Sequence, residues 1–136
     1  MGSAGRQGNL LSKRAYHPDR GDIIHVNFAP SAGREFTGPH FGLVISTISF
    51  SLSTGLCIVL PTTTKYHADQ RLQQTQLMVA LPTMAELARP GWVCTHQIKT
   101  IDYCERGASF MTKVDDDFLI EIMDRVRSFI DPDSVV

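Results

Sequence analysis

The chain has 136 residues, 43% of them hydrophobic and 20% charged, which is the composition of one globular domain with a real core. Its net charge of −1 argues against a generally basic nucleic-acid binder, and no apolar run approaches the length of a membrane helix. Three cysteines without a CxxC pair argue against a disulfide framework or a structural zinc site. Because the first nine residues also lack a signal-peptide core, we expect a cytoplasmic protein with reduced thiols.

The predicted elements begin after a glycine-rich tail. Residues 1–19 offer little to bury, so we expect a flexible tail there, followed by a single domain over residues 20–132. Every second residue from 24 to 28 is apolar, which predicts a half-buried strand. Residues 29–39 have a proline near each end and two glycines, which is typical of a long loop.

Apolar and β-branched runs predict five further strands. The first of them is expected to be central, a polar turn is expected over residues 49–54, and the second strand is expected to stop at Pro61. These strands are predicted at residues 41–48, 56–60, 76–81, 92–101 and 109–114.

The last part of the chain predicts a helix. Apolar residues between 118 and 130 recur on one helical face, and Pro132 follows them. The three aspartates at 115–117 fit an N-cap and the positive end of the helix dipole better than a metal cluster. Several strands followed by one amphipathic helix predict a mainly β protein, a compact barrel or curved sheet with the helix packed on it.

The charge is unevenly distributed along the chain. Residues 1–75 carry seven Lys and Arg against four Asp and Glu, whereas residues 76–136 carry six against ten. All five histidines precede residue 97. A local site for a polyanion is therefore permitted in the first two-thirds of the chain, although the charge does not require it.

Five short segments then form a recognisable series. In chain order they are Arg20-Gly21-Asp22-Ile23, Gly33-Arg34-Glu35, Pro61-Thr62-Thr63, Gln97-Ile98-Lys99 and Arg106-Gly107-Ala108. With the apolar strands between them and the helix after them, their order and spacing resemble the MazF/PemK family of toxin–antitoxin endoribonucleases, over about residues 20–131.

The resemblance implies a fold, an activity and partners. The fold is an SH3-like β-barrel with one C-terminal helix, of the MazF/CcdB type, and the protein is a homodimer. The activity is cleavage of single-stranded RNA at a short sequence, without a metal or another cofactor. The partners are the RNA substrate and a cognate antitoxin that lies over the RNA groove; a membrane is not among them.

The resemblance also assigns roles to individual residues. Glu35 matches the loop glutamate of the family, Thr63 the threonine at the cleavage centre, and Gln97 and Lys99 the late-strand positions. Many relatives carry Arg-Pro where this chain has His40 and Phe41, and that arginine is the family's main catalytic residue.

RNA cleavage without a metal needs three groups. A base takes the proton of the 2′-hydroxyl, a cation stabilises the extra charge on phosphorus, and an acid protonates the leaving 5′-oxygen. Histidine serves as acid or base near neutral pH, and arginine pairs with two phosphate oxygens. We therefore predict a catalytic set in which His40 is the acid or base, Arg34 the phosphate clamp, Glu35 a base or the orienter of His40, and Thr63 a hydrogen-bond donor to the phosphate.

Other polar residues are predicted to contact RNA. The late strand and the residues after Pro61 supply them: Thr62, Lys65, His96, Gln97 and Lys99. His67 and Arg71 extend the loop that contains Lys65. The competing interpretation is that these residues, with His40 and Arg34, are ordinary loop, surface or hydrogen-bonding side chains.

A second function remains open from the sequence. Since His40 stands where relatives have the catalytic arginine, the chain could instead be a non-cleaving module of the same fold that binds RNA or inhibits a protein target, as CcdB does. A metal-dependent hydrolase is disfavoured, because no cluster of His, Asp or Glu has ligand spacing.

Overall fold

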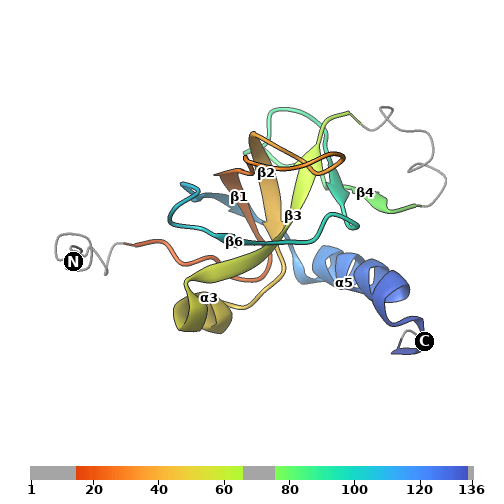
Figure 1. Ribbon diagram of the computed structural model, residues 1–136. Coiled ribbons are helices and arrows are strands. Elements are labelled where there is room, and N and C mark those ends of the chain that lie inside the picture. Colours follow the sequence, from red (N-terminus) through yellow and green to blue (C-terminus); the bar gives the residue numbers. More distant parts are fainter. Residues whose placement is uncertain (1–14, 66–75, 135–136) are drawn as a thin grey trace.

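The computed structural model describes residues 15–65 and 76–134, which form a curved antiparallel sheet with a long helix packed against it (Figure 1). The helical elements of this part are α3 (Ile48–Thr54), α5 (Asp116–Ile130) and a short 3-10 turn, η2 (Pro132–Ser134). The strands are β1 (Asp22–Asn27), β2 (Pro39–Val44), β3 (Leu56–Thr63), β4 (Met78–Ala80), β5 (Trp92–Cys94), β6 (Lys99–Asp102) and β7 (Ser109–Lys113).

The strands pair in the order β4-β5-β3-β2-β1-β7, and β6 also pairs with β3. β2 lies inside the sheet between β1 and β3, which confirms the prediction of a central strand. The expected mainly β fold with a C-terminal helix is confirmed. Among the described residues the sheet is strongly curved but stays open, because β4 and β7 do not pair with each other.

β3 is longer than predicted. It passes through Pro61 and ends at Thr63, so the prediction that Pro61 stops the strand was wrong. On one edge, residues 56–59 pair with β6 and residues 62–63 pair with β5, whereas residues 60–61 pair only with β2 on the other edge. Pro61 thus falls between the part of β3 that pairs with β6 and the part that pairs with β5. Its missing N–H therefore removes no hydrogen bond to β5 or β6.

The segment after β2 was also predicted incorrectly. The strand ends at Val44, and α3 replaces the expected polar turn at residues 49–54. Thr47 caps this helix by accepting a hydrogen bond from the Phe50 N–H, and Gly55 ends it in a left-handed conformation. Local capping at both ends outweighs the β-propensity of this segment.

The predicted strand at residues 92–101 is two strands with a turn between them. Thr95 Oγ1 donates to the Leu77 carbonyl at 2.6 Å, and the Gln97 N–H donates to the Cys94 carbonyl at 3.2 Å. The turn ends β5, which pairs with β4. It lets the chain continue as β6, which pairs with the other end of β3.

Buried apolar side chains form two clusters on opposite faces of the sheet. The first contains Ile23, Leu43 and Leu60 and is covered by Phe118, Leu119, Ile122 and Val126 of α5. The second contains Ile24, Val44 and Cys57, so neighbouring residues of one strand alternate between the clusters. α5 begins as predicted, with Asp115 Oδ1 accepting from the Phe118 N–H at 2.8 Å.

Of the tail predicted at residues 1–19, residues 1–14 lie outside the described part. Residues 15–19 pack against the domain: the Ser51 hydroxyl donates to the Pro18 carbonyl at 2.7 Å, and Asp19 Oδ1 accepts from the Ile48 N–H at 2.9 Å. Within the described ranges, no helix is both long and apolar enough to cross a membrane.

Candidate active site

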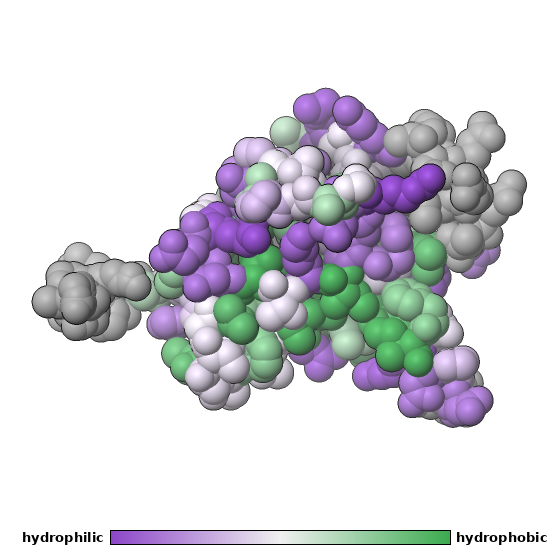
Figure 2. Space-filling view, viewed as in Figure 1, coloured by the Kyte–Doolittle hydropathy of each residue, from purple (hydrophilic) through white to green (hydrophobic). Residues whose placement is uncertain are grey.

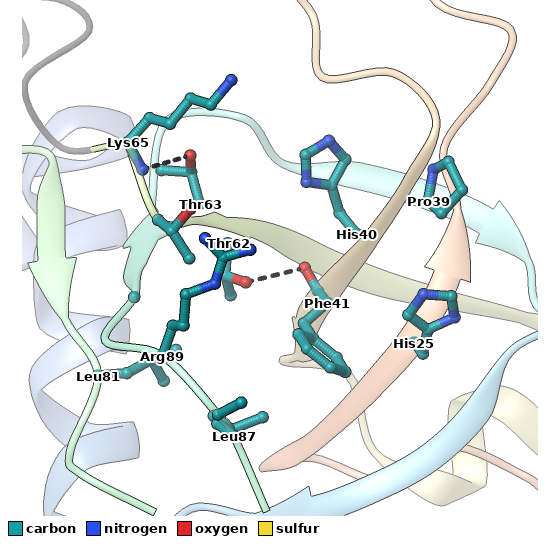
Figure 3. Close-up of a pocket in the computed structure, with 13 residues that line it drawn as sticks. His25, Pro39, His40, Phe41, Thr62, Thr63, Lys65, Leu81, Leu87 and Arg89 are labelled. Atoms are coloured by element: carbon teal, nitrogen blue, oxygen red, sulfur yellow. Dashed lines mark hydrogen bonds between the residues drawn. The ribbon is translucent and has the colours of Figure 1, made fainter.

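A hollow of about 420 Å³ opens at the end of the sheet where β2 begins and β3 ends (Figure 3). We call it the threonine hollow. Its polar lining residues are His25, His40, Thr62, Thr63, Thr64, Lys65 and Arg89, and its apolar wall includes Phe41, Leu81 and Leu87. The lining contains two cations and no carboxylate, so the hollow has the character of an anion site with a partly apolar wall.

The threonines are positioned by the extension of β3 beyond Pro61. Thr62 is buried, and its hydroxyl donates to the Phe41 carbonyl of β2 at 3.1 Å. Thr63 accepts a hydrogen bond at Oγ1 from the Lys65 N–H at 3.0 Å. A hydroxyl that accepts in this way keeps its own proton for another acceptor, so Thr63 can donate into the hollow.

Two histidines border the same hollow. His40 of β2 is half-buried against the rings of Phe36 and Phe28, at centroid distances of 5.1 Å and 6.3 Å. His25 of β1 is exposed and meets Phe41 edge-on at 5.5 Å. The aromatic contacts restrict the His40 ring to a position facing the hollow (Figure 3).

Arg89 comes from the loop between β4 and β5. Figure 3 shows its side chain running up from that loop, with the guanidinium directed toward Thr62 and Thr63. Neither Arg89 nor His25 was predicted from the sequence as a site residue. No local motif marks either residue, and Arg89 is 26 positions from Thr63 along the chain.

A second hollow, which we call the glutamate hollow, lies between the long loop and the turn into β6. It measures about 570 Å³ and is more open to solvent. Its polar lining residues are Arg34, Glu35, His96, Gln97, Lys99 and Thr100. Lys99 Nζ donates to Glu35 Oε1 at 3.3 Å, and the Ala32 N–H donates to the same oxygen at 3.2 Å. The Ala32 N–H, and then the Lys99 ammonium, hold the pKa of the Glu35 carboxyl below its ordinary value, so Glu35 is an anion near neutral pH.

Gln97 connects this hollow to the loop. Its Oε1 accepts from the Phe36 N–H at 2.9 Å, and its Nε2 donates to the Arg34 carbonyl at 2.8 Å. Since the Phe36 ring touches His40, Gln97 indirectly fixes one wall of the threonine hollow. The side chain that we predicted to bind RNA is thus engaged with backbone groups of the loop.

The structure divides the predicted catalytic set. His40 and Thr63 line the threonine hollow, together with the predicted RNA-binding residues Thr62 and Lys65. Arg34 and Glu35 line the glutamate hollow, together with His96, Gln97 and Lys99. The contacts of the Glu35 carboxylate are with Ala32 and Lys99, and those of the His40 ring are with two phenylalanines. His67 and Arg71 lie outside the described residues.

The described residues offer no metal centre: over 15–65 and 76–134, no three His, Cys, Asp or Glu side chains are grouped so as to hold an ion. Fold and hollows together define a class, a small antiparallel β protein with a hollow lined by cations and hydroxyls at one end of its sheet. Within that class, the sequence model of the PemK-like, MazF-like toxins of type II toxin–antitoxin systems matches residues 19–130, and the chain belongs to this family.

Individual relatives agree with the family assignment. The chain is 31% identical over 94 residues to the endoribonuclease toxin MazF of Escherichia coli K12. The matched segment covers 69% of this chain and 77% of that protein. It is similar to the crystal structure of MazF from Deinococcus radiodurans, with a TM-score of 0.74, 28% identity, and coverage of 85% of this chain and 98% of that one. A MazE-MazF structure from the same organism gives a TM-score of 0.67 at 29% identity, covering 85% of this chain and 97% of that one.

Proposed function

We propose that this chain is the toxin of a type II toxin–antitoxin system, a cytoplasmic endoribonuclease that cuts single-stranded RNA without a metal. Its relatives include the E. coli endoribonuclease toxin MazF, and the family is one of such toxins. The observation that carries the proposal is the lining of the threonine hollow. It combines a half-buried histidine, a threonine hydroxyl with a proton to donate, and cations without a carboxylate.

The reaction is a transfer within the RNA strand. The 2′-oxygen attacks phosphorus while the bond from phosphorus to the 5′-oxygen breaks, which leaves a 2′,3′-cyclic phosphate and a 5′-hydroxyl. The 2′-hydroxyl gives its proton to a base, and the 5′-oxygen gains one from an acid. His40 transfers one of these protons, because it lines the hollow and an imidazole can act as either acid or base.

Glu35 and its neighbours act beside the cleaved linkage. The Glu35 carboxylate accepts hydrogen bonds from Ala32 and Lys99, which makes it a weaker base. We therefore propose that Glu35 and Gln97 together hold the loop that carries Phe36 in place. Arg34, His96 and Lys99 line an open, mostly cationic hollow suited to the next stretch of RNA backbone. Lys65 and Thr62 contribute at the edge and floor of the threonine hollow.

The proposal includes partners. A MazE-MazF structure is among the similar ones, so we propose a cognate antitoxin for this chain. We also propose a homodimer as its active form, as the family resemblance implies. The alternative, a module that binds RNA or a protein target without cutting, is separated from the main proposal by a cleavage assay.

The test is incubation of the purified protein with a long unstructured RNA in EDTA, with the new ends mapped and their chemistry determined. We expect discrete cuts that leave 2′,3′-cyclic phosphates. His40→Ala and His40→Gln should cut at least about 100-fold more slowly, the usual size of a lost acid–base group, with unchanged circular dichroism and melting temperature.

The other results are equally informative. If both folded His40 variants still make the wild-type cuts, the proposed ribonuclease activity stands and His40 has no part in its mechanism. A folded wild-type protein that makes no cuts would contradict the proposed activity and favour the non-cleaving module.

A further inference from the structure

The arginines of the described residues differ in what they contact. Arg106 donates to the Ala29 carbonyl at 2.6 Å, Arg125 to the Gln76 carbonyl, and Arg127 pairs with Asp124 at 3.2 Å. Arg89 is exposed, and within the described ranges no Asp or Glu lies within ion-pair distance of it. Its guanidinium is therefore available to an anion that enters the threonine hollow.

The surroundings of Arg89 favour a phosphate. Its guanidinium is directed toward the end of β3, where the Thr63 hydroxyl keeps a proton to donate (Figure 3). Leu81 and Leu87 form an apolar wall near the same loop. When a ligand displaces water from such a wall, the attraction between a guanidinium and a phosphate is stronger than in open solvent.

We propose that Arg89 is a catalytic residue that binds the non-bridging oxygens of the phosphate being cleaved. This inference rests on the proposed ribonuclease function and identifies its cation. The guanidinium pairs with two oxygens at once, and the charge of these oxygens increases as the 2′-oxygen bonds to phosphorus, so the interaction is strongest in the transition state. Thr63 donates to the same phosphate, and His40 transfers a proton at the other side of the hollow.

The two other candidate cations fit this role less well. Arg34 lines the glutamate hollow, where Glu35 pairs with Lys99 and where neither His40 nor Thr63 is present. The Lys65 ammonium points away from the centre of the threonine hollow in Figure 3. An ammonium also lacks the planar pair of N–H donors with which a guanidinium binds two phosphate oxygens. Arg34 then holds RNA beside the cleaved linkage and contributes to affinity instead of rate.

The experiment compares four variants in EDTA: Arg89→Ala, Arg89→Lys, Arg34→Ala and, as a matched control, Arg127→Ala on the exposed side of α5. Single-turnover cleavage at saturating RNA gives the rate. A fully 2′-O-methylated copy of the same RNA gives the Kd, because it keeps every phosphate and has no 2′-hydroxyl to react. Melting temperatures show whether each variant is folded.

We expect Arg89→Ala to lose at least about 100-fold in saturated rate, the size found for a lost transition-state donor, while its Kd rises less than about tenfold. Guanidinium ion at tens of millimolar should restore part of that rate, and Arg89→Lys should keep an intermediate rate. Arg34→Ala should mainly raise the Kd, and Arg127→Ala should match the wild type.

An Arg89→Ala protein that cuts within about threefold of the wild-type rate would overturn the inference and leave the ribonuclease intact. So would a large loss that guanidinium does not restore in a protein with a lowered melting temperature, since that pattern is structural. If the wild type does not cut at all, the proposed activity fails. The Kd then decides: equal binding by Arg89→Ala and Arg127→Ala overturns the phosphate contact, and weaker binding by Arg89→Ala alone upholds it.

Discussion

At the scale of single residues, burial separates three chemically identical side chains. Cys57 and Cys94 lie in the interior of the sheet, and burial raises the pKa of each thiol to about 12. Cys104 is exposed in the turn after β6. Since the thiolate is the reactive form, a raised pKa keeps the two buried thiols protonated and inert at any pH well below 12.

This arrangement predicts the number of reactive thiols. At pH 8 a disulfide reagent that releases a chromophore should react rapidly with one thiol per chain, Cys104, and with the other two only after unfolding in denaturant. Cys104→Ser should abolish the rapid phase in the folded protein. Rapid reaction of two or three thiols in the native wild type would contradict the burial of Cys57 and Cys94.

The residue scale also shows which of the predicted site residues the fold brings together. His40 and Thr63 were both predicted from the chemistry of RNA cleavage and the family resemblance, and they line one hollow. Arg34 was predicted beside them because it is close in sequence, yet it lies in the other hollow. Their roles in catalysis stay predictions until the variants are measured.

At the scale of elements, the contact between β2 and β3 depends on one glycine. A Cβ added to Gly42 would lie 2.6 Å from Val59 Cγ2 and 3.2 Å from Phe28 Cζ, and both neighbours are fully buried. Buried branched and aromatic side chains cannot move aside freely in a close-packed interior. The strand pair that carries His40 and Thr63 therefore requires a residue without a side chain at position 42.

Gly42→Ala should consequently destabilise the fold by about 1–3 kcal/mol, the usual range for an overpacked core. The free energy of unfolding, measured in urea, checks this value. Gly91→Ala is the matched control, because its added Cβ would meet Leu81 Cδ1 and the Thr63 carbonyl oxygen at 3.4 Å, much closer to ordinary contact. Equal stabilities of the two variants would contradict the packing described for Gly42.

Several element boundaries were beyond sequence reasoning. The alternation of residues 24–28 and the helical spacing after Asp115 correctly predicted β1 and α5. The same rules placed a turn where α3 lies and ended β3 at Pro61. A proline stops a strand only if its N–H is needed, and that depends on which strands pair on each edge.

At the scale of the whole molecule, apolar surface and charged surface are separated. Figure 2 shows hydrophobic residues gathered on the face between α3 and α5, whereas the end bearing the long loop is mostly hydrophilic. The exposed large apolar residues of the two helices are Ile48, Leu52, Ile120, Phe129 and Ile130. Large exposed apolar areas are typical of interaction surfaces, and none of these five residues lines the threonine hollow.

We expect the protein to be a homodimer, with twice the chain mass of 15.1 kDa in light scattering coupled to size exclusion. An interface of apolar side chains should persist in 1 M salt, which screens charges but does not weaken apolar contacts. A mass of one chain across a micromolar concentration series would contradict the dimer. Loss of the dimer in salt alone would indicate a charged interface instead.

The sequence by itself determined the fold class, the central strand, the capped C-terminal helix and the family resemblance, because these depend on local spacing and on short motifs in order. Only the tertiary structure decided which polar residues share a hollow. Residues 34 and 40 are close in sequence but line different hollows, while Arg89 and Thr63 are 26 positions apart and line the same one. The pairing and curvature of the sheet set these distances, and both arise from contacts between strands that are far apart in the chain.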